Sequence, residues 1–227
     1  KSLGFCPPQW LEIDPSTNFE NINFFPVILK PSVGGGGSSH CYIAQDMPEL
    51  KALSSYLNLA LPKQKLVVQE YVGDSESEYT VGVLMDMDGQ YINSIAMNRY
   101  LKSQLNIRAK YPNKTGKKDL GEYLVISSGV SHGRIDRYPE ITNACRKIAE
   151  AIKAKGAINI QLRFVNGEIK VFEINPRFSG TTSLRAMMGY NEPDILIRKH
   201  ILGENFDSDF DYNTGVILRS LKEDILN

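Results

Sequence analysis

The alternation of apolar runs and turn residues predicts a chain built mostly of short β-strands. Each run is four to eight residues long and rich in Val, Ile, Leu, Phe or Tyr, which is typical of strands. The turn residues Asp86–Gln90 and Val165–Glu168 each separate two such runs, which predicts two β-hairpins. Strands are expected at Phe24–Pro31, Cys41–Ala44, Leu66–Val72, Tyr79–Met85, Tyr91–Met97, Leu124–Ser127, Ala157–Phe164 and Ile169–Ile174.

Apolar residues at helical spacing predict three helices. The first follows Asp46, an N-cap residue with Glu49 at the capping-box position, and its apolar face is Leu50, Leu53 and Leu57. A second is expected over Glu140–Lys155, and its apolar face is Ile141, Ala144, Cys145, Ile148, Ala149 and Ile152. The third is expected over Glu192–Leu202, ending at Gly203, and the polar, basic stretch Lys110–Leu120 is expected to form a mobile loop. Hairpins mixed with packed helices predict an α+β protein.

Composition narrows the classes of function. The 26 basic and 26 acidic residues give a formal net charge of zero, so the chain lacks the basic surplus of nucleic-acid-binding proteins. Three cysteines without a C-x-x-C pair predict reduced thiols in a cytoplasmic protein. No apolar run reaches the roughly 20 residues that a membrane span needs. Because the chain opens at Lys1 without methionine, we expect an N-terminal part to be missing.

A lysine and a run of glycines are the first candidate for chemistry. Lys30 closes a predicted strand, and the loop Ser32–Ser39 that follows contains four consecutive glycines. An ammonium group beside a loop rich in free N–H groups suits the binding of a polyphosphate. Glycine runs are more often plain flexible loops, however. The phosphate motif G-x-x-x-x-G-K-[ST] is not matched, because no lysine follows the glycines.

Oxygen-bearing side chains at a strand end are the second candidate. Alternation along the strand places Glu173 and Asn175 on one face, and Gln161 lies roughly opposite on the partner strand of the hairpin. Mg²⁺ prefers such oxygen ligands. Arg177, just past the strand, could reach a phosphoryl group during transfer. The alternative is a solvated polar strand end.

The third candidate is the segment Gln69-Glu70-Tyr71-Val72 followed by Glu78. A strand that runs into a bend can offer backbone groups to the edge of an adenine and carboxylates to ribose hydroxyls. Surface carboxylates are the alternative for this segment. The sequence Gly129–Gly133 also matches the nucleophile-elbow pattern G-x-S-x-G, but no helix is predicted immediately after the serine, so we interpret this match as chance.

Together these residues resemble the ATP-grasp superfamily. The resemblance is greatest to the ATP-grasp domains of the carbamoyl-phosphate synthase large subunit and related carboxylate–amine ligases, and it covers about residues 20–203. It is carried by FPVILKPSVGGGGSS, by VVQEYV with a downstream glutamate, and by NIQLRFVNGEIKVFEINPRFSG. It implies two α+β subdomains that clasp ATP. We expect a linker or remnant over residues 1–23, a small subdomain with the glycine-rich flap over 24–66, and a large subdomain with the metal site over 67–227. The usual domain preceding the ATP-grasp fold would be missing.

Carried over position by position, the resemblance implies a role for each candidate. Lys30 would contact the phosphates, and the flap would lie above them. Glu70 and the backbone near Val72 would hold adenine, and Glu78 would hold ribose. The implied nucleotide-binding set is Lys30, Gly34, Gly35, Gly36, Gly37, Ser38, Gln69, Glu70, Tyr71, Val72 and Glu78. The implied metal ligands are Gln161, Glu173 and Asn175, and the implied catalytic residues are Arg177 and Lys30.

The resemblance further implies an enzyme that uses ATP and Mg²⁺, with Mn²⁺ as a substitute, to activate a carboxylate or bicarbonate-like substrate as an acyl phosphate for attack by an amine. Its partners would be small molecules, without nucleic acid or membrane, and a homo-oligomer is left open. Two alternatives remain at this point. One is an ATP-grasp kinase that stops at phosphoryl transfer, and the other is a non-catalytic nucleotide-binding module.

Overall fold

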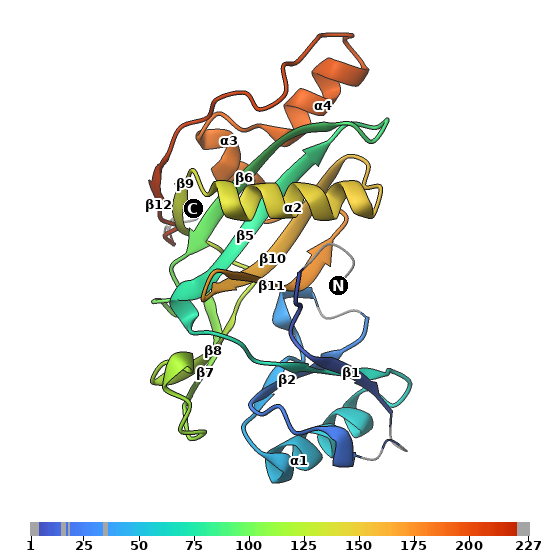
Figure 1. Ribbon diagram of the computed structural model, residues 1–227, viewed down its shortest axis with the longest axis vertical. Helices are drawn as coiled ribbons and strands as arrows, with labels where there is room; N and C mark the ends of the chain where they lie inside the picture. Colours follow the sequence, from blue (N-terminus) through green and yellow to red (C-terminus); the bar gives the residue numbers. More distant parts are fainter. Residues whose placement is uncertain (1–4, 15–16, 18, 34–35, 222–227) are drawn as a thin grey trace, which may run out of the picture. The chain divides into compact units, whose positions relative to one another are not determined.

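The computed structural model describes residues 5–14, 17, 19–33 and 36–221. The chain divides into two compact units that are each built from three sequence segments. Figure 1 shows the helices and strands. The first unit comprises Lys1–Tyr79, Leu101–Val130 and Gln161–Ile174, and the second comprises Thr80–Tyr100, Ser131–Ile160 and Asn175–Asn227.

Strands and helices alternate in the mixed manner predicted for an α+β protein. The strands are β1 (Trp10–Ile13), β2 (Val27–Pro31), β3 (Tyr42–Ala44), β4 (Leu66–Glu70), β5 (Glu78–Met85), β6 (Tyr91–Arg99), β7 (Ile107–Pro112), β8 (Tyr123–Ser127), β9 (Gly133–Asp136), β10 (Ala157–Val165), β11 (Glu168–Asn175) and β12 (Gly215–Ile217). The α-helices are α1 (Met47–Ala60), α2 (Pro139–Ala151), α3 (Thr182–Met187) and α4 (Glu192–His200), and the short 3₁₀ turns are η1 (Phe19–Asn21), η2 (Gly36–Ser38), η3 (Ser75–Ser77) and η4 (Lys118–Leu120).

A four-stranded sheet in the order β1-β4-β2-β3 belongs to the first unit. Its neighbouring strands are all antiparallel. Alternate residues of β2, such as Val27 and Leu29, are fully buried and pack with Val68 of β4 and Leu50 of α1 in one apolar cluster. Lys30 lies between the buried residues Leu29 and Pro31, so the pleat of β2 turns its side chain to the opposite face.

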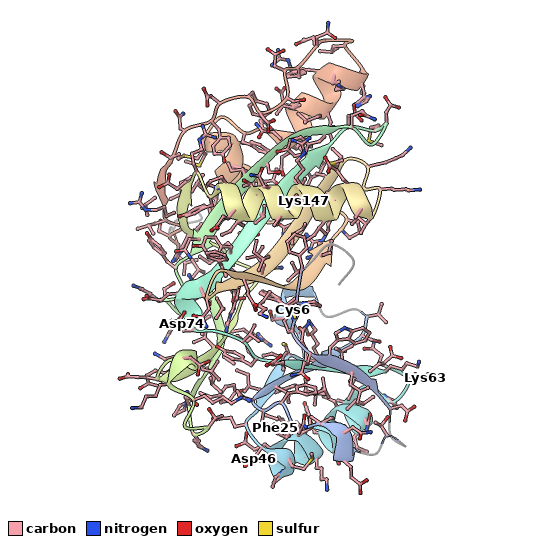
Figure 2. All side chains as sticks on the ribbon, viewed as in Figure 1. Cys6, Phe25, Asp46, Lys63, Asp74 and Lys147 are labelled. Atoms are coloured by element: carbon pink, nitrogen blue, oxygen red, sulfur yellow. The ribbon has the colours of Figure 1, made fainter. Side chains whose placement is uncertain are left out.

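Helix α1 begins where its cap residues predicted. The side chain of Asp46, which is labelled in Figure 2, accepts a hydrogen bond of 2.9 Å from the backbone N–H of Glu49. In return the Glu49 carboxylate accepts the N–H of Gln45 at 2.8 Å, one residue earlier than a capping box requires. Two of the three predicted apolar residues, Leu50 and Leu57, are completely buried.

A second hairpin of the first unit corrects one sequence prediction. The stretch Lys110–Leu120 was expected to be a loop, but β7 continues to Pro112 and pairs with β8. Ala109 and Tyr111 turn inward onto an apolar cluster, whereas the residues between them are exposed. The strand was missed because its outward positions are basic and hide the short apolar alternation.

A six-stranded sheet in the order β11-β10-β5-β6-β9-β12 completes the strand pairing. Within the second unit, α2 packs on β6, as Figure 1 shows. The core of this unit includes Leu84 of β5, Ile95 of β6 and Tyr190. The predicted turn between β5 and β6 is present, with the Asp86 carboxylate accepting two backbone N–H groups from the turn.

Helix α2 is shorter than predicted. It ends at Ala151 instead of Lys155, and Lys153 and Gly156 both take positive φ angles, 54° and 70°, which leave the helical conformation. Ile152, which was assigned to the apolar face, is therefore 53% exposed, while the other five residues of that face are buried. Among the described residues, no helix is long and apolar enough to cross a membrane.

Candidate functional site

Lys30 is held in place by two hydrogen bonds within the first unit. Its Nζ donates to Gln69 Oε1 at 2.9 Å and to the carbonyl oxygen of Phe172 at 3.3 Å. Gln69 is on β4, the antiparallel neighbour of β2, and Phe172 is on β11. The predicted phosphate-binding lysine is therefore oriented by one side chain and one backbone group from two other strands.

Burial destabilises the charged form of Lys30. Burial lowers the pKa of the Lys30 ammonium from its ordinary value of 10.5, and the negative charge of Glu173 acts in the opposite direction. Burial raises the pKa of the neighbouring Cys41 thiol to about 11, so this thiol is neutral near pH 7. A cation that has lost much of its hydration gains more from an incoming anion than an exposed lysine would.

Of the predicted metal ligands, Gln161 is on β10, and Glu173 and Asn175 are on β11. Gln161 Nε2 donates to Glu173 Oε2 at 2.8 Å, so these two side chains meet as the hairpin predicted. The turn between the strands has positive φ angles at Asn166 (52°) and Gly167 (77°), which a tight hairpin turn requires. Glu173 is exposed, as a ligand must be if water and phosphate oxygens are to complete the coordination of a metal.

Asn175 and Arg177 lie in the second unit. Asn175 ends β11, two residues after Glu173, so both side chains project from the same face of that strand. Arg177 is exposed, and its Nη1 donates to the carbonyl of Phe178 at 2.9 Å. The carboxylate of Glu173 and the side-chain amides of Gln161 and Asn175 could each ligate a metal through oxygen, which is the ligand atom that Mg²⁺ prefers. The residues present therefore fit this cation.

The glycine-rich loop is described from Gly36 onward, and the predicted contacts Gly34 and Gly35 lie outside the described residues. Gly36 and Gly37 are exposed, and both Gly37 (65°) and Ser38 (61°) have positive φ angles. The Ser38 hydroxyl donates to the carbonyl of Ser127 at 2.7 Å. This end of the loop is thus tied to the end of β8.

The segment predicted to bind the nucleoside is held by neighbours on each side. The Glu70 carboxylate accepts the N–H of Gln9 at 3.0 Å. The Tyr71 ring is 4% exposed, and its hydroxyl accepts the N–H of Val125 at 2.8 Å. Since the Tyr71 side chain belongs to the core, any nucleotide contact at this position falls to its backbone.

Glu78 forms an ion pair that the sequence did not predict. Arg163 on β10 approaches Glu78 at 3.2 Å, and both residues are almost completely buried. The same guanidinium donates to the carbonyls of Val72 and Gly73. Arg163 was missed because it is one basic residue inside an apolar strand, which gives no pattern that marks its partners.

The bend between β4 and β5 is also fixed by its own hydrogen bonds. Asp74, labelled in Figure 2, accepts the backbone N–H groups of Glu76 and Ser77, both at 3.0 Å. Gly73 takes a φ of 66°, and a Cβ there would meet Val165 at 2.5 Å. A residue other than glycine would therefore be strained at this position.

The chance match to a nucleophile elbow is confirmed as such. Strand β9 begins at Gly133, directly after Ser131 and His132, where the elbow would require a helix.

Comparison with known proteins connects these features to a family. A sequence model described as "ATP-grasp in the biosynthetic pathway with Ter operon" matches residues 126–223. The carbamoyl phosphate synthase large chain of Methanosphaerula palustris is 27% identical over 162 residues, covering 70% of this chain and 14% of that protein. The N-terminal section of this large chain in Methanopyrus kandleri is 27% identical over 165 residues, covering 70% of this chain and 26% of that protein. The chain thus spans 14% and 26% of the length of these two relatives.

Solved structures share the fold. D-alanine–D-alanine ligase from Bacillus anthracis, complexed with ATP, matches with a TM-score of 0.57 and 17% identity, covering 89% of this chain and 62% of that one. N5-carboxyaminoimidazole synthetase from Staphylococcus aureus, complexed with ADP, matches with a TM-score of 0.60 and 13% identity, covering 95% and 51%. At these identities the likeness concerns the fold, and it agrees with the α+β architecture predicted from the sequence.

Proposed function

We propose that the chain is an ATP-grasp enzyme, namely a Mg-ATP-dependent ligase that activates a carboxylate for attack by an amine. The ATP-grasp family model that matches residues 126–223 and the similarity to carbamoyl phosphate synthase large chains support this proposal. The observation that carries the proposal lies in the first unit, where Lys30 Nζ donates to the carbonyl of Phe172, the residue before Glu173, and Gln161 donates to the Glu173 carboxylate. The residue predicted to bind phosphate and a residue predicted to bind the cation therefore lie on neighbouring segments, which supports the proposal.

The residues have distinct roles in this proposal. Lys30 neutralises charge on the phosphates, and Gln69 and the Phe172 carbonyl keep its ammonium in position. Gln161, Glu173 and Asn175 hold the Mg²⁺, for which Mn²⁺ can substitute, and the cation supplies charge neutralisation at the phosphates. Arg177 stabilises the phosphoryl group that is transferred. Gly34–Ser38 cover the phosphates, and the segment Gln69–Val72 with Glu78 holds the nucleoside.

The reaction needs no covalent intermediate on the protein. A carboxylate oxygen of the substrate attacks the terminal phosphorus of ATP, and ADP leaves with the electron pair of the broken bond. The acyl phosphate then reacts with an amine at its carbonyl carbon, phosphate leaves, and the amine loses a proton. Catalysis rests on positioning and charge neutralisation, as in phosphoryl transfer generally.

Product analysis tests the proposal. ADP and phosphate release would be measured with a panel of carboxylates, each with and without amines. A ligase forms the amide product only when the amine is present, whereas product formation without any amine would identify a kinase. ATP binding without turnover on any pair would favour a non-catalytic nucleotide-binding module.

The variant Glu173→Gln serves as the active-site control. It keeps the shape of the side chain but removes the charge that faces the cation, so we expect turnover to fall by at least about a hundredfold. Glu168→Gln on the same strand is the matched control, because Glu168 is exposed and pairs with Lys170, two residues along the same strand. We expect it to retain the activity of the unaltered chain. Near-normal turnover by Glu173→Gln would overturn the assignment of the metal site.

A further inference from the structure

Arg163 is a buried, extensively hydrogen-bonded side chain beside the candidate site. It is 5% exposed and lies on β10, two residues after Gln161, so both side chains project from the same face of the strand. No sequence pattern had assigned it a role.

All the N–H groups of the Arg163 guanidinium have acceptors. Its Nε and Nη2 donate to Glu78 Oε2 at 3.3 and 3.2 Å, and Nη2 also donates to the carbonyl of Val125 at 3.2 Å. Its Nη1 donates to the carbonyls of Val72 at 3.1 Å and Gly73 at 3.0 Å. The number of these hydrogen bonds, five, matches the number of N–H donors in a guanidinium group. The plane also lies over the Tyr71 ring, with Cζ at 4.4 Å from the centroid.

Stability alone is a poor explanation for such an arrangement. A buried ion pair loses so much hydration that apolar residues of similar volume often serve the folded state equally well. The guanidinium of Arg163 instead fixes the relative positions of the groups that it contacts. Its rigid fork fixes the Glu78 carboxylate against the backbone at Val72 and Gly73, and a lysine could not reproduce this with its single nitrogen.

We propose that Arg163 is the positioning residue of the nucleoside half of the site, where it makes recognition of the base and the ribose depend on each other. The inference rests on the proposed function, in which the backbone near Val72 holds adenine and Glu78 holds ribose. Arg163 does not touch the nucleotide. It sets the spacing between the backbone that meets the base and the carboxylate that meets the sugar hydroxyls.

Calorimetry with Arg163→Lys tests the inference. The probes are ADP, 2′-deoxyADP and tripolyphosphate, all with Mg²⁺. In Arg163→Lys we expect ADP to bind about tenfold more weakly, as for the loss of a charge-assisted hydrogen bond. We expect the preference for ADP over 2′-deoxyADP to approach one, while the affinity for tripolyphosphate, which has no nucleoside, stays unchanged.

Arg185→Lys is the matched control. Arg185 is equally buried, in the second unit, where it pairs with the buried Glu192 at 3.1 Å and donates to Asn159. Its loss should lower stability in the same way but leave the preference between the two nucleotides unaltered. If Arg163→Lys does not fold, Arg163→Gln, which leaves Glu78 in place and keeps an N–H donor, carries the same expectation.

The outcomes separate the two proposals. If the unaltered chain binds none of the three probes, the proposed function fails, and this inference fails with it. If the unaltered chain prefers ADP and the Arg163 variant keeps that preference, only this inference is overturned. An equal change in Arg185→Lys would also overturn it, because the effect would then reflect general loosening of the fold.

Discussion

At the scale of single residues, the burial of Lys30 has a consequence for pH dependence. Because burial lowers the pKa of Lys30 below 10.5, the folded chain loses this proton at a lower pH than the unfolded chain does. Between those two pKa values the unfolded state binds more protons, so this group makes stability rise with pH through that window. An anion bound beside Lys30 acts in the other direction, because it favours the charged ammonium.

We therefore predict that nucleotide affinity declines in the alkaline range as Lys30 loses its proton. The decline should begin below the pH expected for an unperturbed lysine, with ADP binding measured by calorimetry at increasing pH. In Lys30→Arg the guanidinium stays charged throughout, so the curve should become flat even if affinity is lower overall. A parallel decline in both proteins would mean that another group controls binding.

The sequence could supply most of the candidate site at this scale because its signals are local. Lys30 stands beside its glycines, and Glu173 and Asn175 share one strand. Arg163 gave no such signal, since its acceptors at Glu78 and Val72 are 85 and 91 residues away along the chain. A contact between such distant positions depends on how strands pair, and one sequence does not specify that.

At the scale of elements, those with a local sequence signal were predicted, and those that depend on distant partners or are very short were missed. The hairpin of β10 and β11 was found because its strands and turn are contiguous. Strand β1 was missed because Glu12 interrupts its four residues and its partner β4 begins far along the chain, at Leu66. Helix α3, with six residues, is too short to show an apolar period. Non-local pairing and short length are thus the physical reasons for these omissions.

The glycine-rich loop gives a prediction at this scale. Gly36 and Gly37 are exposed and have no side chains to pack, and the described end of the loop is held at Ser38 by one side-chain hydrogen bond to Ser127. We predict fast amide hydrogen exchange at Gly36–Ser38 in the free chain and slower exchange with a bound ATP analogue, because phosphate oxygens would accept these N–H groups.

The turn at Asn166 and Gly167 is the internal control, since it is also exposed and glycine-containing but carries no predicted phosphate contact. Its exchange should not change. Replacing Ser38 with alanine should speed exchange at the loop in the free chain. Equal rates at Gly36–Ser38 with and without saturating analogue would count against a loop that covers the phosphates.

At the scale of the whole molecule, nucleotide binding should appear as thermal stability that depends on Mg²⁺. A ligand that binds only the folded chain stabilises it by about 2.7 kcal/mol at a hundred times its Kd. For a protein of this size that corresponds to a rise in Tm of roughly 5–10 °C. We predict such a rise with ADP and Mg²⁺, and a smaller rise when EDTA removes the cation, since the carboxylate at Glu173 would then face the phosphates without a neutralising charge.

The variant Glu173→Gln distinguishes this explanation from a general effect of divalent cations on the fold. With the carboxylate replaced by an amide, the difference between the Tm values measured with Mg²⁺ and with EDTA should shrink, while Glu168→Gln should keep the full difference. Because ADP lacks the group that is transferred, the measurement reports binding without any turnover. A rise in Tm that is the same with Mg²⁺ and with EDTA in the unaltered chain would show that the nucleotide binds without the cation, and the ligand set Gln161, Glu173 and Asn175 would then have to be abandoned.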